Sequence, residues 1–360
     1  LKPSALQSEA LDLLLVFTNP PRLDRIDGHA HEIAPRDAKA FAALVQSRLD
    51  SLLDLTDGQL KAKAVELLMQ LQLRVEPAVL QSIVADQTAR ASLRAGALKM
   101  LASTGDFGTS LDLALDKKSP AELRREALTQ LFTHQPERAI TAAATALKEA
   151  DTATKQLTLS LLANSKDDTV ITEWLDLLAR NKAPASIQLD ILEAAATRES
   201  LKPKLTAIQT QNTELLEGGD VTRGRDIATN HLGANCIACH TIEAKEGSQV
   251  GPNLKTIGSM KDRQYILEAL LNPLATVASG YGLVSLTLKD GKTLSAVLDK
   301  EDAQSIRLKL PDGKLQSVPL HHIASRTPPV SVMPSMLGIL TKTEIRDVVA
   351  YLASLKAKKK

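Results

Sequence analysis

The chain has 360 residues and a formal net charge of +2, with 44% hydrophobic, 24% charged and only 2% aromatic residues. This length allows roughly two or three domains, and the small net charge leads us to expect neither nucleic acid nor an anionic membrane as a partner. The sequence holds no apolar run near the ~18 residues of a membrane span, so no transmembrane segment is expected. Because aromatic residues are scarce, the core must be built mainly from Leu, Ala, Ile and Val, which suits packed helices.

The first two hundred residues carry a repeated amphipathic segment. Five copies begin 30 to 33 residues apart, at Leu60, Leu93, Leu123, Thr154 and Ile187. In the second copy, Leu93, Ala97 and Leu101 fall at the spacing of one helix face. A helix pair of this size cannot bury its apolar face alone, so consecutive pairs are expected to stack. The pattern resembles HEAT-type repeats, which implies an α-solenoid over residues 1–210 that serves as a scaffold or interaction surface.

A long loop rich in proline and charge follows the first repeat-like helix, which begins at Leu6. The loop contains His29, His31 and Glu32, residue types that can ligate a metal. Such a site needs a third, distant ligand, and the sequence offers no obvious one, so surface or packing roles are favoured for both histidines. The chain does not begin with Met, so a processed or truncated product is expected, and an array that opens on a repeat helix suggests more protein upstream.

The chain has two cysteines, Cys236 and Cys239, and His240 directly follows the second. A disulfide between them would close a very small loop and stabilise little. A structural zinc site usually takes four protein ligands, and the chain has no second cysteine pair. A thioredoxin-like redox pair follows a strand of a parallel sheet, whereas residues 221–235 here have the pattern of a helix. The remaining interpretation is covalent haem attachment, for which Cys-x-x-Cys-His is the signature.

Haem attachment explains the spacing of these residues. Two thiols about one helical turn apart can each add to a vinyl group of one porphyrin, and the histidine that follows then lies beneath the iron. The sequence GPNL comes next, at Gly251 to Leu254, and here the chain resembles class I cytochromes c. The resemblance implies that the Pro252 carbonyl accepts a hydrogen bond from Nδ1 of His240, which fixes the ring, and that Leu254 packs against the porphyrin.

Class I cytochromes end in a helix that crosses their first helix, and residues 340–355 have this form. Thr341 and Glu344 are spaced as a capping box. The helix has a stripe of apolar residues to bury, namely Ile345, Val348, Val349 and Leu352. Gly224 lies in the expected first helix, where class I domains often need a small residue for a close crossing.

The sixth iron ligand of a class I cytochrome is usually a methionine, often followed by proline. Met333 and Pro334 match this pattern just before the terminal helix, so Met333 is predicted as the distal ligand. Met336 is the second candidate and is expected to form part of the pocket wall instead.

Three histidines offer an alternative to methionine as the distal ligand. His231 lies shortly before the cysteine pair, on the proximal side, where it is poorly placed to reach the distal face. His321 and His322 end a strand-like segment, where a surface or turn role is favoured. Ligation by histidine and methionine therefore remains the prediction.

The compact cytochrome pattern is interrupted between Pro273 and Met333. Over about 279–326, four alternating apolar runs are separated by polar turns, two of which contain Asp-Gly. Asp-Gly between alternating runs is a strong hairpin signal. We therefore expect a small antiparallel sheet or barrel inserted into the helical domain, holding the distal methionine loop and covering one haem edge.

Residues 220–355 as a whole resemble a family of putative haem-binding domains with such an inserted β element. The matching pieces are CIACH, GPNL, LNPLATVASGYG, KDGK, MPSML and the terminal helix. In that family the cytochrome often follows helical repeats, and a β-propeller resembling quinone-dependent sugar dehydrogenases commonly lies upstream. The resemblance implies a mainly α protein, in which a HEAT-like solenoid precedes a class I cytochrome c domain over residues 211–360.

The function expected from these features is electron transfer, without enzymatic catalysis in this chain. One haem c, bound through Cys236 and Cys239, would accept electrons from a redox partner protein or an upstream dehydrogenase domain. Covalent attachment of haem takes place in an exported compartment such as the periplasm. Histidine and methionine together fill both axial positions, which favours electron transfer over chemistry at the iron. Two alternatives stay open: a haem enzyme or sensor with an open iron position, and a solenoid scaffold with a mainly structural haem.

Overall fold

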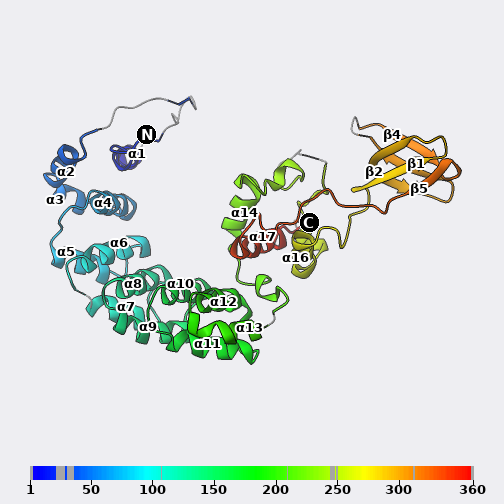
Figure 1. Ribbon diagram of the computed structural model, residues 1–360. Helices are drawn as coiled ribbons and strands as arrows, with labels where there is room; N and C mark the ends of the chain where they lie inside the picture. The colour runs from blue at the N-terminus through cyan, green and yellow to red at the C-terminus, as the bar shows by residue number, and fades with distance from the viewer. Residues whose placement is uncertain are drawn as a thin grey trace. The chain divides into compact units, whose positions relative to one another are not determined.

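A computed structural model describes residues 3–21, 29–30, 36–106, 108–208, 210–243, 248, 250–310 and 313–357 (Figure 1). The protein is mainly helical, with one small antiparallel sheet of five strands, which confirms the predicted mainly α composition and the inserted β element. The chain divides into two compact units, residues 1–174 with 193–199 and residues 175–192 with 200–360. Of the helices in the described part of the chain, none combines the length and apolar character needed to cross a membrane.

The first unit is a succession of helices. They are α1 (Pro3–Leu15), α2 (Ala38–Gln46), α3 (Leu49–Leu53), α4 (Gly58–Gln70), α5 (Pro77–Ala85), α6 (Ala91–Ala102), α7 (Gly108–Leu115), α8 (Ala121–His134), α9 (Pro136–Glu149) and α10 (Thr152–Ala163). The division between the units falls within the next two helices, α11 (Thr169–Ala179) and α12 (Gln188–Ala196). Local sequence sets several of the starts: Asp57 and Asp151 accept backbone hydrogen bonds as N-caps, and Pro136 occupies the first turn of α9.

The five repeat copies are all helical, in α4, α6, α8, α10 and α12. Helix α6 contacts α4 and α8, and α8 contacts α10, so these helices form a continuous row within the first unit. The helices between them pack on this row, as α5 does on α6 and α7 on α8. The predicted stripe of Leu93, Ala97 and Leu101 is buried. In the possible metal site of the loop after α1, His29 is exposed, and His31 and Glu32 lie outside the described residues.

The helical part of the second unit is built around two crossing helices, α14 (Val221–Asn230) and α17 (Lys342–Ser354). Short helices α13 (Lys202–Ala207) and α15 (Ile257–Met260) and the longer α16 (Arg263–Leu271) complete it. The predicted capping box is present, since the Thr341 side chain accepts from the Glu344 amide and the Glu344 carboxylate accepts from the Thr341 amide. The predicted stripe of α17 is buried in the core with residues of α14 and α16.

Charged side chains inside this core are paired. Arg346 is 2% exposed and donates two hydrogen bonds to Asp190 on α12, at 2.7 and 3.2 Å. Asp347 is 1% exposed and accepts from the Asp220 amide at 2.7 Å and from Nε of Arg223 at 2.7 Å. A buried charge that loses its partner costs several kcal/mol, about 3–5 in measured cases. These pairs therefore fix α17 against α14 and against the first turn of α12.

The sheet comprises β1 (Gly282–Leu288), β2 (Thr293–Glu301), β3 (Ser305–Lys309), β4 (Leu315–Pro319) and β5 (Ile323–Arg326), in the order β4-β3-β2-β1-β5. Its neighbouring strands are antiparallel. The turn between β1 and β2 has Gly291 at a φ of +85°, as an Asp-Gly hairpin requires. The four predicted strands are present, and β5 was not predicted because three of its four residues are exposed and lack apolar alternation.

Candidate functional site

A cavity of about 340 Å³ lies within the second unit. Seven residues that the sequence singled out line it: Cys236, Cys239, His240, Pro252, Leu254, Met333 and Met336. They come from three separate stretches, namely the turn after α14, the loop before α15 and the segment before α17. Most of the remaining wall is apolar, with Ile266 and Leu270 of α16 and Leu352 of α17. Its volume is in the range of ~300–1,000 Å³ typical of small-molecule and cofactor sites.

The cysteine pair lies on a tight turn that follows α14. His231 is the C-cap residue that follows α14, and its Nδ1 accepts hydrogen bonds from the amides of Gly233 and Ala234 at 3.1 and 3.0 Å. The His240 amide then donates to the Cys236 carbonyl at 2.9 Å, which closes one turn around the two cysteines. This turn places both thiols on the cavity wall, whereas His231 is not among the lining residues and serves the local turn.

The two thiols are free and differ in exposure. Cys236 is partly buried, Cys239 is exposed, and no disulfide joins them. Burial raises the pKa of the Cys236 thiol, so this group is held in its neutral form at neutral pH. Within the described ranges, no three His, Cys, Asp or Glu side chains gather in a way that would hold a metal ion.

The ring of His240 is fixed on two sides. Its Nδ1 lies 2.8 Å from the carbonyl oxygen of Pro252, which is the contact that the resemblance implied. With the proton on Nδ1 in this hydrogen bond, Nε2 carries the lone pair that can bind a metal. Gly251 lies against the ring: a Cβ at this position would be 2.5 Å from Cε1 and 2.8 Å from Nδ1 of His240. Sequence reasoning used Gly251 only as part of a motif, and the close approach to the ring gives its physical role.

The substitution Gly251→Ala is expected to tilt or displace the His240 ring. The added methyl cannot occupy the same space as the imidazole, and the Gly251 amide is tied to the Cys239 carbonyl at 2.7 Å, so the ring must move. The expected result is weaker binding of an imidazole-seeking ligand at this site and an altered imidazole signal in NMR spectra. Gly291→Ala, in a turn with no atom within 4 Å of the new methyl, is the control and should leave the His240 signal unchanged.

The two methionines in the segment before α17 differ in environment. Met336 is 3% exposed, and its amide donates to the Leu270 carbonyl at 2.8 Å, so it is part of the core. Met333 is only half-buried, and its amide donates to the Ser331 hydroxyl at 3.1 Å. Met260 also lines the cavity but is 60% exposed. His321 and His322 are exposed, lie between β4 and β5, and do not line the cavity.

Lys261 and Tyr265 line the cavity and were missed by sequence reasoning. The Lys261 ammonium lies 4.2 Å from the centre of the Tyr265 ring. Among the described residues on the cavity wall, Lys261 is the only side chain that carries a formal charge at neutral pH. Lys261 lies in extended backbone after α15 and Tyr265 lies in the first turn of α16, so no helical spacing in the sequence indicates this contact.

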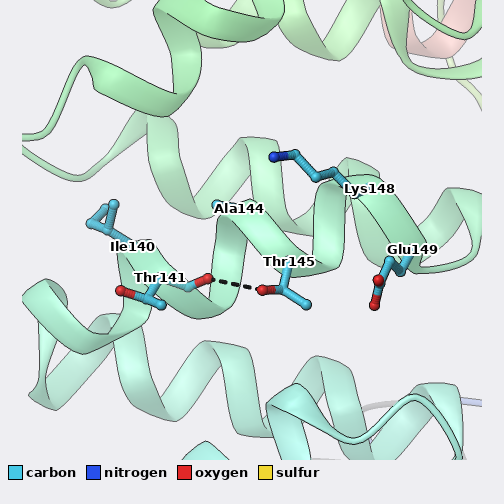
Figure 2. A pocket seen from close by; sticks show the side chains of 6 residues that line it. All are labelled: Ile140, Thr141, Ala144, Thr145, Lys148 and Glu149. Atoms are coloured by element: carbon cyan, nitrogen blue, oxygen red, sulfur yellow. Dashed lines mark hydrogen bonds between the residues drawn. The ribbon is translucent and has the colours of Figure 1, made fainter.

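A second hollow, of about 420 Å³, follows one face of α9 in the first unit (Figure 2). The six residues that line it all belong to this helix: Ile140, Thr141, Ala144, Thr145, Lys148 and Glu149. The Thr145 hydroxyl donates to the Thr141 carbonyl at 3.3 Å, and the Lys148 ammonium lies 3.7 Å from a carboxylate oxygen of Glu173. These polar groups are occupied within the helix layer, so the hollow offers no chemistry comparable to that of the cysteine turn.

The cavity with the cysteine turn is therefore the candidate site. No protein-family model matches the chain, and neither does any curated protein.

Proposed function

We propose that this protein is a c-type cytochrome that transfers single electrons, with a class I-like haem domain after a HEAT-like α-solenoid. The observation that carries the proposal is the meeting of three sequence-distant groups on one apolar cavity. These groups are the Cys236–Cys239–His240 turn, the loop at Pro252 and the methionine segment at Met333. Each supplies one part of what a covalently bound haem requires. A disulfide or a simple redox thiol pair would not need the other two groups on the same cavity.

The side chains fit a haem c as follows. Cys236 and Cys239 would form the two thioethers, and His240 would bind the iron through Nε2 while the Pro252 carbonyl holds Nδ1. Gly251 supports the fit, because the absence of a Cβ makes the space that the imidazole occupies. Met333 would supply the sixth ligand. A haem held in this way supplies a one-electron iron couple.

The surrounding residues favour electron transfer over catalysis. Ile266, Leu270 and Leu352 are buried and make their part of the cavity wall apolar. An apolar surrounding favours the less charged form of a bound redox group. Lys261 and Tyr265 offer a cation and a hydroxyl to the carboxylates that a haem carries. With His240 and Met333 both bound, no open position would be left for a substrate or dioxygen.

The rest of the proposal concerns the context of the haem domain. Helices α4, α6, α8 and α10 form a row with their partner helices packed on it, which supports the solenoid interpretation. We propose that this array is an interaction surface for the electron donor, a dehydrogenase partner or upstream domain. We also propose an exported, periplasmic location, because haem is attached to Cys-x-x-Cys-His motifs outside the cytoplasm.

The experiment that tests the proposal is expression with a periplasmic haem-attachment system, followed by acid–acetone extraction. The haem is expected to stay with the protein, and the reduced minus oxidised spectrum should have the sharp bands of a low-spin c-type haem. A double variant, Cys236→Ala with Cys239→Ala, should lose the extraction-resistant haem. Haem that leaves wild-type protein in acid–acetone, or wild-type protein that acquires none, would refute the proposed function.

A further inference from the structure

The inserted sheet reaches the cavity through its two connections. The connection before β1 lines the cavity with four residues, namely Thr276, Val277, Ala278 and Tyr281. The connection after β5 lines the cavity with residues 331–334. No described residue of the five strands lines it. The sheet was expected to cover one edge of the site, but the lining residues come from its connections and not from its strands. Any influence of the sheet on the site must pass through these connections.

The two connections are joined at the base of β1. The Leu283 amide donates to the Val330 carbonyl at 2.9 Å, and the Val330 amide donates to the Leu283 carbonyl at 2.9 Å. Two residues further along β1, the Ser285 amide donates to the Thr327 hydroxyl at 2.9 Å and the Thr327 amide donates to the Ser285 carbonyl at 3.0 Å. These four hydrogen bonds fix residues 327–330 to β1, directly before the segment that carries Met333.

Gly282 lies at the tightest point of this junction. A Cβ at Gly282 would be 2.5 Å from Cβ of Pro329 and 3.1 Å from Cγ1 of Val277. Gly282 is buried and begins β1, and Val277 itself lines the cavity. A glycine in a strand often marks such a close approach between backbones. The residue therefore brings the incoming connection and the outgoing connection into direct contact.

We propose that Gly282 is a positioning residue for the distal ligand loop, and that the inserted sheet acts as a clamp that holds Met333 in place. This inference rests on the proposed function in so far as Met333 is the ligand. Val330 is fixed by its two hydrogen bonds to Leu283, and the Met333 amide is held by the Ser331 hydroxyl, so only a short segment separates clamp and ligand. A methyl group added at Gly282 would push Pro329 outward, and this displacement would shift the segment that carries Met333 away from the cavity wall.

The test is Gly282→Ala in the full chain, with Gly291→Ala as the matched control. Both substitutions add one methyl to the first hairpin, but Gly291 has a φ of +85° and no atom within 4 Å of the new methyl, so it strains the turn without touching Pro329. Gly282→Ala is expected to weaken the ferric methionine–iron absorption band and to let the reduced protein bind carbon monoxide. The haem should remain covalently attached, and Gly291→Ala should keep the wild-type band.

A second measurement does not depend on haem. Limited oxidation with hydrogen peroxide, read by mass spectrometry, should proceed several times faster at Met333 in Gly282→Ala than in wild type, with no change at the buried Met336. The double variant Gly282→Ala with Pro329→Gly removes the colliding Cβ and should restore both readouts in part. Equal behaviour of Gly282→Ala and Gly291→Ala in both readouts overturns the clamp. If wild-type protein acquires no covalent haem in the attachment host and Met333 still oxidises faster in Gly282→Ala, the clamp is retained and the proposed function is refuted.

Discussion

Met333→Ala is expected to abolish the methionine–iron band of the ferric protein and to give a reduced protein that binds carbon monoxide stoichiometrically. The Met333 thioether would be the sixth ligand of the iron, so its removal is expected to open that position. Stability should change little, because Met333 is only half-buried and its backbone amide keeps its contact with the Ser331 hydroxyl. Absorption spectra, carbon monoxide titration and urea unfolding of the same preparations provide the measurements.

Met336→Ala should have the opposite profile. Its side chain is 3% exposed within the core, and truncating a buried methionine costs about 2–5 kcal/mol. We therefore expect a large loss in the free energy of unfolding with the methionine–iron band retained at low denaturant. Met260→Ala, a 60% exposed position on the same cavity, controls for nonspecific effects and should change neither property.

The two methionine variants also separate the alternative functions. A band lost in Met336→Ala and kept in Met333→Ala would assign the ligand to Met336. Carbon monoxide binding by wild-type reduced protein would indicate an open iron position and favour an enzyme or sensor. A wild-type protein with a covalent haem that gives no reversible redox couple in voltammetry would favour the structural role.

The parts of the site that sequence reasoning located are those set by short local patterns. The spacing of Cys236, Cys239 and His240 follows from one turn of chain, and the Thr341–Glu344 box follows from the geometry of a first helical turn. The resemblance to class I cytochromes added the partner of His240, and the hydrogen bond to Pro252 is present. Apolar periodicity in the same way located the repeat helices and the stripe of α17.

The features that escaped prediction depend on contacts between distant segments. Gly251 and Gly282 have no positive φ and no turn signal, so only the neighbouring ring of His240 and the ring of Pro329 explain why they lack a side chain. The pairing of Arg346 with Asp190 joins residues 156 positions apart, and nothing in either local sequence indicates it. Strand β5 is held by its pairing with β1 rather than by an apolar pattern of its own. In each case the determining partner lies elsewhere in the chain.

Gly224→Ala, at the crossing of α14 and α17, is expected to cause the largest loss in the free energy of unfolding. A Cβ at Gly224 would lie 2.0 Å from the carbonyl oxygen of Asp347 and 2.8 Å from Cβ of Tyr351. In an isolated helix this substitution would stabilise by about 1 kcal/mol, because alanine has the higher helix propensity. Here the collision is with backbone, which cannot rotate away, so the helices must separate. We expect a net loss of about 3 kcal/mol or more in the free energy of unfolding.

Gly58→Ala is the matched control for this effect. Gly58 begins α4 and has no atom within 4 Å of an added Cβ, so the substitution should be neutral or slightly stabilising, by about 0.4–1 kcal/mol. Urea unfolding of both variants measures the difference, and the haem content of Gly224→Ala reports on the site, because α14 leads into the cysteine turn and Leu352 of α17 lines the cavity. If both variants unfold within about 0.5 kcal/mol of each other, the two helices do not cross at Gly224. Loss of stability together with loss of attached haem would instead mean that this crossing is a precondition for the cysteine turn to hold its cofactor.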